Sequence, residues 1–383
     1  MRLATDAPLL IIAFNRPEKT RLVFDAVRAA APKRLYLAAD GPRVDVPSDV
    51  DRCDRTRRVL EDVTWSCEVQ RLYQTDNLGC KRGVGAAIDW FLTHEERGII
   101  LEDDCIPTPD FFPFCAELLE RYHDDPAVMM IGGHNPLGTW DSTEGSYVFT
   151  RTAPIWGWAT WRRAWSRYDP ALSRWAEPQA HALVRSRMPF TEYHITRQRF
   201  DSVHEGRVDT WDFGWAFAIL INRGVSVIPG VNLVANIGFD QEATHTRRLA
   251  RGESAVPTHP IDWPLRPPQS TTPDSRFERA LFKNRFPLGR RVVATLPPRA
   301  RDWVRAAAHC AAALVGPRRS GVSTPHEMHV HETGELGERS ATAASDVDDC
   351  GRDIPPGQAR DAMTSLRRSS QQRKIRKDRS SSP

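Results

Sequence analysis

Residues 98–112 read GIILEDDCIPTPDFF and join a short apolar run to three consecutive acidic residues. The run 98–101 is typical of a strand that is buried on both faces of a sheet. It leads directly into Glu102, Asp103 and Asp104. Adjacent carboxylates repel one another and are costly to desolvate unless a cation neutralises them. This stretch therefore predicts a cation site at the end of a buried strand, and the alternative interpretation is a solvated acidic turn.

The segments around this stretch alternate between apolar runs and helical patterns. Strands are expected at 8–14, 34–39, 67–74, 98–101, 128–131 and 225–228, and helices at 17–30, 47–63, 83–91 and 110–122. Such alternation implies right-handed crossovers and a mostly parallel sheet with helices on both faces. The expected fold class is α/β.

Polar residues follow the ends of the expected strands. They are Asn15, Arg16, Asp40, Asp76, Asn77, Glu102, Asp103, Asp104 and residues 132–135. Because ligands bind at the carboxyl ends of parallel strands, these side chains are expected to gather at one edge of the sheet. This edge is the predicted functional site.

A glycine-containing segment, NLGCKRG at 77–83, precedes the third expected helix. A helix that begins at glycine offers backbone N–H groups to a phosphate, and Lys81 and Arg82 add positive charge. The segment lacks the GxGxxG fingerprint, which argues against a dinucleotide-dependent dehydrogenase.

Composition sets broad limits on the class of protein. The chain has 383 residues, 40% of them hydrophobic, and 12 tryptophans, which is enough for one large core. The formal net charge of +4 comes mostly from the C-terminal end, so no nucleic-acid partner is expected for the folded part. Seven cysteines without a CxxC pair, no signal peptide and no long apolar stretch predict a reduced, cytoplasmic protein.

The C-terminal third changes in character. Prolines between 251 and 268 suggest an extended segment that wraps over the preceding domain, and 301–315 could form an Ala-rich helix. Residues 316–383 lack aromatic side chains and end in a basic run, which predicts a disordered tail. A solvated tail is the simplest interpretation, and contact with an anionic membrane surface or a nucleic acid is the alternative. The expected organisation is a catalytic domain at 1–250, an extension at 251–315 and the tail.

The acidic motif also resembles a known family. The box EDDCIPTPDFF, residues 102–112, is similar to the metal box of the N-acetylglucosaminyltransferase I family, in which EDD is followed after four residues by PDFF. Residues 8–40 resemble the opening of bacterial family 2-like glycosyltransferases. Both groups have the GT-A fold, and the resemblance covers roughly residues 6–248.

The resemblance implies a metal-dependent glycosyltransferase that uses a nucleotide-diphospho-sugar, with a UDP-sugar favoured, for cell-surface or secreted glycans. By this resemblance Asp104 binds Mn²⁺ or Mg²⁺, and a metal of this type takes one or two carboxylates together with substrate phosphates. The residues expected to surround the nucleotide-sugar are Asn15, Arg16, Asp40, Lys81, Arg82, Glu102 and Asp103.

Asp212 in the sequence DTWDFGW, 209–215, matches the position of the general base in these transferases. Asp209 is the reserve candidate, and the alternative role of Asp212 is to cap the next helix. A direct base predicts an inverting, single-displacement transfer to a hydroxyl acceptor.

Two further assignments have equally plain structural alternatives. In the aromatic cluster 156–165, Trp158 and Trp161 are interpreted as contacts to a sugar ring, although tryptophans at this density are also typical of a core. His245 is a candidate second metal ligand, although a lone histidine is more often structural.

Two other functions remain open from the sequence. A sugar-phosphate nucleotidyltransferase would be expected to carry a Gly-rich, basic loop after the first strand, where this chain has Asn15-Arg16-Pro17-Glu18. A non-catalytic glycan-binding module would not need the acidic motif.

Overall fold

A computed structural model describes residues 6–141, 145–238, 256–286, 288–295 and 300. All of the described residues belong to one compact unit. The predicted helix at 301–315, the predicted tail and the predicted ligand His245 lie outside the described residues. The three-part organisation predicted from the sequence stays a prediction.

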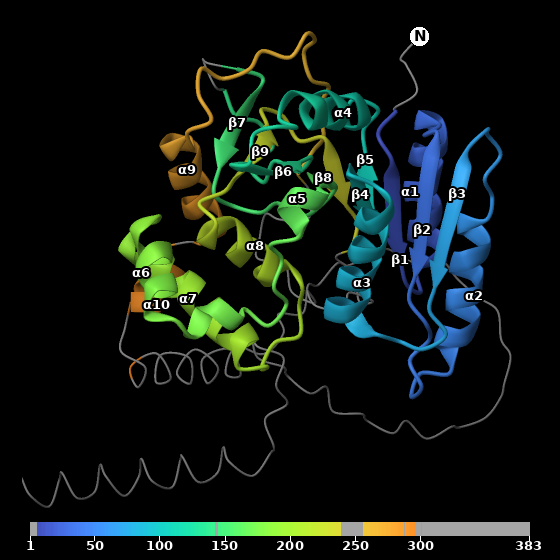
Figure 1. Ribbon diagram of the computed structural model, residues 1–383, viewed down its shortest axis with the longest axis horizontal. Helices are drawn as coiled ribbons and strands as arrows, with labels where there is room; N and C mark the ends of the chain where they lie inside the picture. Colours follow the sequence, from blue (N-terminus) through green and yellow to red (C-terminus); the bar gives the residue numbers. More distant parts are fainter. Residues whose placement is uncertain (1–5, 142–144, 239–255, 287, 296–299, 301–383) are drawn as a thin grey trace, which may run out of the picture. The chain divides into compact units, whose positions relative to one another are not determined.

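The N-terminal part of the chain alternates between strands and helices, as the sequence predicts (Figure 1). The elements are β1 (Leu9–Ala13), α1 (Pro17–Ala30), β2 (Arg34–Ala39), α2 (Ser48–Leu60), β3 (Glu68–Tyr73), α3 (Gly79–His94), β4 (Arg97–Glu102), β5 (Cys105–Pro107), α4 (Phe111–Arg121) and β6 (Val128–Gly132).

The second part is richer in helices. Its elements are β7 (Tyr147–Thr150), β8 (Trp158–Trp161), α5 (Arg162–Trp165), the 3₁₀ helix η1 (Ser173–Ala176), α6 (Pro178–Ser186), α7 (Phe190–His204), α8 (Asp212–Ile221), β9 (Val225–Pro229), β10 (Val234–Asn236), α9 (Ser275–Arg285) and α10 (Leu288–Thr295).

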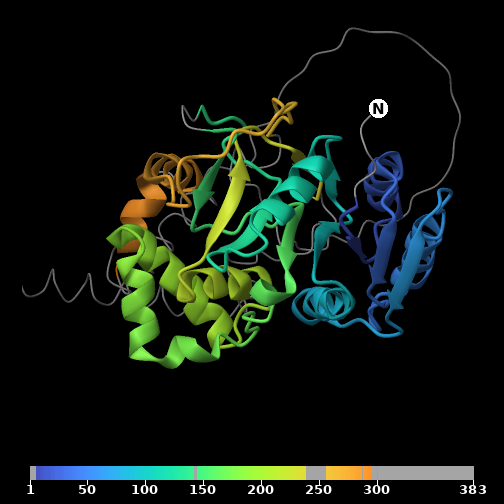
Figure 2. The ribbon, with the colours of Figure 1, turned by 45° about the horizontal axis from the view of Figure 1, so that its top comes forward.

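Eight strands form one sheet in the order β3-β2-β1-β4-β8-β6-β9-β7. Strands β3, β2, β1 and β4 are parallel to one another, and β1 and β2 run side by side in both views (Figures 1 and 2). Strands β6 and β9 are also parallel, whereas β8 and β7 run antiparallel to their neighbours. The predicted α/β class with a mostly parallel sheet is therefore confirmed.

Apolar side chains alternate along the strands and form one core on each face of the sheet. In β1, Leu9 and Ile11 pack on the face that α1, α2 and α4 cover, whereas Leu10 and Ile12 pack on the face of α3, α5 and α8. This alternation follows from the twofold period of a strand. Helices on both faces leave the strand ends as the place where polar groups meet.

The aromatic cluster contains a strand that the sequence did not predict. Residues Trp158–Trp161 form β8, which runs antiparallel between β4 and β6. Its four residues are all buried, because successive side chains enter the two opposite cores. A buried run of only four residues cannot be told from a buried helical segment by periodicity alone.

The proline-containing segment contacts several earlier parts of the fold. Its Ile261 N–H and Trp263 Nε1–H donate to the buried carboxylate of Asp110, at 3.3 and 3.2 Å. Arg266 and Ser146 exchange hydrogen bonds, and helix α9 then packs beside β7 (Figure 1). Among the described residues, no helix is both long and apolar enough to cross a bilayer.

Candidate functional site

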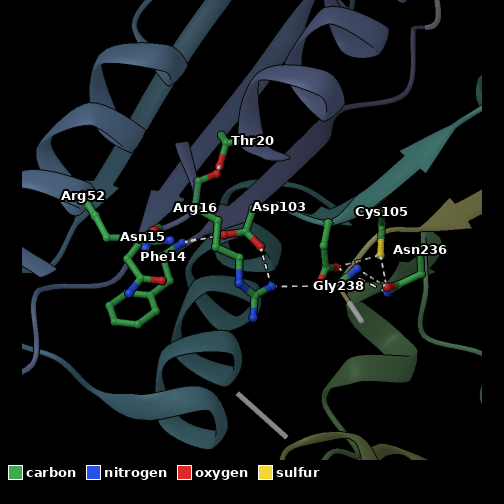
Figure 3. A network of polar contacts seen from close by, with 10 residues as sticks. Phe14, Asn15, Arg16, Thr20, Arg52, Asp103, Cys105, Asn236 and Gly238 are labelled. Atoms are coloured by element: carbon green, nitrogen blue, oxygen red, sulfur yellow. Dashed lines mark hydrogen bonds and ion pairs between the residues drawn. The ribbon is translucent and has the colours of Figure 1, made fainter. Parts of the chain in front are cut away.

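Arg16 joins the two aspartates at the end of β4. Its Nη1 lies 3.2 Å from Asp103 Oδ1 and 2.7 Å from Asp104 Oδ2, so one nitrogen stands between two carboxylates (Figure 3). The side chains of Arg16 and Asp104 are only 12% and 16% exposed. The parallel pairing of β1 with β4, which aligns Ile12 with Glu102, brings these residues together. The sequence prediction that polar strand ends converge is thus correct for Arg16 and the acidic motif.

The backbone holds Arg16 and Asp103 in place. Pro17 occupies the first turn of α1, and the carbonyl of Arg16 accepts hydrogen bonds from the N–H and the hydroxyl of Thr20. Asp103 Oδ2 accepts the N–H of Phe14 at 3.0 Å, and Asp103 is 5% exposed. These bonds tie the backbone at the start of α1 to the end of β4.

Asp104 is held on its other side by the end of β10. Asn236 Nδ2 donates to Asp104 Oδ1 at 3.4 Å, and the Asn236 carbonyl oxygen Oδ1 accepts the N–H of Gly238 at 2.7 Å (Figure 3). The backbone of Ile237 also donates to the Asp104 carbonyl at 2.8 Å. A Cβ at Gly238 would lie 2.1 Å from Asp104 Oδ2, so only glycine allows this approach.

The acidic motif carries more negative charge than Arg16 can neutralise. Burial, followed by the charges of Asp104 and Asp103, raises the pKa of Glu102 well above its ordinary value. Burial also raises the pKa of Asp103 to about 6, although Arg16 opposes the shift. In the described part of the chain, no hydrogen bond or ion pair reaches the Glu102 carboxylate. The site therefore favours an additional positive charge.

Asp40 has a different role from the predicted one. Its carboxylate accepts the N–H groups of Gly41, Leu78 and Gly79 at 2.9 to 3.1 Å, and Asn77 Nδ2 at 3.1 Å. These bonds hold the loop at the start of α3, which begins at Gly79 rather than at the predicted residue 83. Because protein donors occupy its carboxylate, Asp40 positions this loop and does not offer its oxygens to a nucleotide. Two of the N–H groups predicted to bind phosphate are likewise occupied.

The side chain of Asn15 also has a partner within the protein. Its Nδ2 donates to Asp49 Oδ1 at 2.7 Å, and the residue is 9% exposed. Arg43 pairs with the same aspartate at 2.6 Å. The Arg43 hydrogen bond, together with that of Asn15, lowers the pKa of Asp49 although burial opposes it. The Asn15 side chain thus ties the β1 loop to α2, and its contact with a nucleotide stays a prediction.

The start of α3 meets the start of α8 beside Glu102. A Cβ at Gly79 would lie 3.6 Å from Asp209 Oδ2. The pKa of the neighbouring Cys80 thiol is raised by burial and then by the charges of Glu102, Asp212 and Asp209. All three carboxylates therefore lie near one thiol, although more than a hundred residues separate Glu102 from the two aspartates in the sequence. The acidic motif and the predicted base therefore lie near one another.

Asp212 is the first residue of α8 and is half-buried. Its Oδ1 accepts a short hydrogen bond from the Thr210 hydroxyl. No side chain makes a capping hydrogen bond at the N-cap of this helix, Trp211, so the alternative role of Asp212 as a cap has no bond to support it. Asp209 is exposed. Of the two predicted candidates, Asp212 is the better enclosed.

Trp158 and Trp161 do not reach the site, and their predicted contact with a sugar is wrong. They are 0% and 1% exposed and lie in the cores on opposite faces of the sheet. Trp161 Nε1 donates to the carbonyl of Leu119 at 3.1 Å. Trp156 is the half-buried tryptophan of this cluster, and it packs against His134 with ring centroids 4.5 Å apart.

Lys81 and Arg82 lie in the first turn of α3, half-buried and exposed respectively. Within the described ranges neither has an ion-pair partner. The described residues contain no group of three or more His, Cys, Asp or Glu that could hold a metal by themselves. Sequence reasoning missed Asn236, because its contact with Asp104 depends on the pairing of β10 with β5 across about 130 residues.

No family model and no curated protein matches the chain. Similar solved structures include HddC from Yersinia pseudotuberculosis, which is 10% identical with a TM-score of 0.25 over 41% of this chain and 77% of that chain. The 4-diphosphocytidyl-2C-methyl-D-erythritol synthase from Anaerococcus prevotii is 8% identical, with a TM-score of 0.28 over 44% and 78%. Mouse xyloside xylosyltransferase 1 is 11% identical, with a TM-score of 0.30 over 56% and 81%. At these TM-scores the function has to be inferred from the site itself.

Proposed function

We propose that the chain transfers a sugar from a nucleotide-diphospho-sugar to a hydroxyl acceptor, in an inverting and metal-dependent reaction. The observation that carries this proposal is the arrangement in which the acidic motif and the start of α8 lie close together, with Glu102 and Asp212 both near the Cys80 thiol. It combines an acidic motif that favours added positive charge with a separate carboxylate on a helix start. The acidic motif suits a metal-bound diphosphate, and the separate carboxylate suits a hydroxyl group that must lose a proton.

The donor atoms of the acidic motif fit Mn²⁺ or Mg²⁺, because such hard cations prefer oxygen ligands. Asp104 would hold the ion, and Asn236 keeps its carboxylate oriented. With few protein ligands available among the described residues, the diphosphate oxygens would complete the coordination. When bound, the ion supplies charge stabilisation to the leaving diphosphate.

The cationic side chains at the same edge suit the diphosphate. Arg16 presents a planar guanidinium that can bind two phosphate oxygens at once. Lys81 and Arg82 stand in the first turn of α3, where the helix dipole also favours an anion. Together with Arg16, these two side chains would supply positive charge to a nucleotide-diphospho-sugar with its metal.

Asp212 would accept the proton of the acceptor hydroxyl. The hydrogen bond from Thr210 engages Oδ1 and leaves Oδ2 for this proton. A general base of this kind contributes about 10²- to 10⁴-fold to a rate. A single attack on the anomeric carbon reverses its configuration, so the product should be inverted.

The direct test is to incubate the full chain with UDP-glucose, UDP-galactose, UDP-N-acetylglucosamine and UDP-N-acetylgalactosamine. Release of UDP would be followed with Mn²⁺ or with EDTA, in the presence of a panel of oligosaccharide acceptors. The proposal expects metal-dependent UDP release from one donor and transfer that depends on Asp212. Absence of release from every nucleotide-sugar, GDP- and CMP-sugars included, would contradict it.

The same assay separates the nucleotidyltransferase alternative. Such an enzyme would form a nucleotide-sugar and pyrophosphate from a nucleoside triphosphate and a sugar phosphate. The loop after β1, Phe14-Asn15-Arg16, has no glycine and holds Asp103 and Asp104 instead of cradling a triphosphate. We therefore favour the glycosyltransferase.

A further inference from the structure

We propose that Arg16 is a built-in counter-ion of Asp104 that must be displaced before a divalent cation binds, so that the metal binds together with the nucleotide diphosphate. This inference rests on the proposed function. Its first support is position, because Arg16 Nη1 lies between Asp103 Oδ1 and Asp104 Oδ2, at 3.2 and 2.7 Å (Figure 3). A divalent cation would have to compete with Arg16 for Asp104 Oδ2.

Each aspartate has a second partner besides Arg16, so both can stay in place when Arg16 moves. Asp103 Oδ2 is anchored by the Phe14 N–H, whereas Asp103 Oδ1 accepts the same Arg16 nitrogen that pairs with Asp104. Asp104 Oδ1 is held by Asn236, while Oδ2 pairs with Arg16. Movement of this one guanidinium nitrogen therefore frees one oxygen on each aspartate, and neither aspartate needs to change its backbone.

The displacement has a cost that a metal ion alone does not offset well. Breaking a largely buried ion pair leaves both charges without their partner. A diphosphate that arrives with the metal gives the guanidinium a new anionic partner, in the bidentate geometry that Arg favours. Metal and nucleotide should therefore each increase the affinity for the other, by the same factor.

The charge of Arg16 is the element that opposes binding of the free metal. Glu102 has no partner in the described part of the chain and lies close enough to be influenced by Asp104 and Asp103. Replacing Arg16 by a neutral residue would leave three carboxylates without this counter-charge. A free divalent cation should then bind more tightly than it does to the wild-type protein.

The test is a titration of Mn²⁺ into the full chain, with bound and free ion separated by electron paramagnetic resonance. It would be done without nucleotide and with saturating UDP, with GDP in parallel. For the wild type we expect weak binding of Mn²⁺ alone and at least a tenfold gain with UDP. For Arg16→Gln we expect at least tenfold tighter binding of Mn²⁺ alone and a gain with UDP below threefold.

Two variants control this experiment. Arg16→Lys keeps the charge and should bind Mn²⁺ alone as weakly as the wild type does. The tighter binding of Mn²⁺ alone that we expect for Arg16→Gln should be lost when Asp104→Asn is added. That loss would place the ion at Asp104. Circular dichroism checks that each variant is folded.

Three results would overturn the inference. One is wild-type protein that binds Mn²⁺ equally well with and without nucleotide, a measurement that needs no variant. Another is an Arg16→Gln protein that binds Mn²⁺ alone no better than the wild type. In both cases the proposed transferase activity survives if donor release still requires metal. The third is no binding of Mn²⁺ under any condition, which would also overturn the metal dependence of the proposed function.

Discussion

Trp158 stacks on Trp211, with ring centroids 5.7 Å apart and an angle of 19° between the planes. Trp211 is the N-cap of α8 and directly precedes Asp212. Trp215, one turn later in the same helix, also packs against Trp158 with centroids 5.7 Å apart. The tryptophan in the middle of the sheet thus fixes the position of the helix start that carries the proposed base.

Replacing Trp158 by alanine should therefore reduce stability rather than sugar affinity alone. The side chain is fully buried, and truncation of a buried Trp costs about 3–5 kcal/mol of unfolding free energy. Urea denaturation followed by circular dichroism measures this change. A stable variant with a selective loss of acceptor affinity would instead restore the interpretation of Trp158 as a sugar contact.

Asp212→Asn should lower kcat by about 10²- to 10⁴-fold, because the acceptor hydroxyl loses its proton acceptor. The affinity for the nucleotide-sugar should change by less than threefold, roughly 0.6 kcal/mol, since Asp212 is assigned to the acceptor side. Steady-state kinetics and isothermal titration measure the two quantities separately.

Asp209→Asn is the matched control for this variant, because Asp209 is a nearby exposed carboxylate outside the proposed chemistry. It should retain at least a tenth of the wild-type kcat. Equal losses in the two variants would argue that general charge, rather than a positioned base, is responsible.

Glu102→Gln should stabilise the ligand-free protein at alkaline pH. Because burial and the neighbouring aspartates raise the pKa of Glu102 above 4.5, the folded state holds its proton where the unfolded state releases it. The folded state then binds more protons, so this group makes stability fall as the pH rises above 4.5 and through the folded pKa. The glutamine side chain of the variant does not titrate, so the variant lacks this loss of stability.

The gain for Glu102→Gln is expected to be larger at pH 8 than at pH 5, because the wild-type carboxyl group loses stability as the pH rises. Urea titrations between pH 5 and 8 in the presence of EDTA would measure it. The gain should shrink toward pH 5, and a difference that is independent of pH would contradict the charge argument.

Gly238→Ala should impair the metal site without unfolding the protein. The added Cβ would lie 2.1 Å from Asp104 Oδ2 and 3.1 Å from Asn236 Oδ1, so the carboxylate has to move. We expect Mn²⁺-dependent affinity for UDP to fall at least tenfold, about 1.4 kcal/mol, in isothermal titration.

Gly85→Ala serves as the control for this substitution. Its Cβ would make only an ordinary contact, 3.6 Å from Tyr168 Cε1, in the interior of α3. It should bind UDP as the wild type does. Wild-type affinity in Gly238→Ala would show that the approach of β10 to Asp104 is unimportant for binding.

The sequence predicts the N-terminal part of this fold well, because its strands and helices have clear periods. The position of the acidic motif after β4 and the convergence with Arg16 follow from the parallel sheet alone. Strand β8 was missed because it has only four residues and lies within a Trp-rich cluster that was interpreted as a sugar contact. A buried tryptophan in a strand and a tryptophan that binds a sugar look alike in a single sequence.

The sequence also did not predict contacts between polar side chains that lie far apart along the chain. Asp40 and Asn15 both follow strand ends, as ligand-binding residues do, but donors and acceptors within the protein occupy them. Asn236 could not be assigned because the short β5–β10 pair has no sequence signal of its own. Strand ends thus locate the site, whereas the partner of each side chain depends on tertiary structure.

The central claim is that the acidic motif binds a metal-bound nucleotide diphosphate through Asp104. The most direct test is a thermal-shift panel of UDP, GDP, CMP and UDP-sugars with Mn²⁺ or EDTA, on the wild type and Asp104→Asn. Binding to the native state raises the melting temperature by linkage. The account predicts a rise with one nucleotide diphosphate that requires both Mn²⁺ and Asp104. A rise that persists in EDTA or in Asp104→Asn, or no rise with any nucleotide, would contradict it.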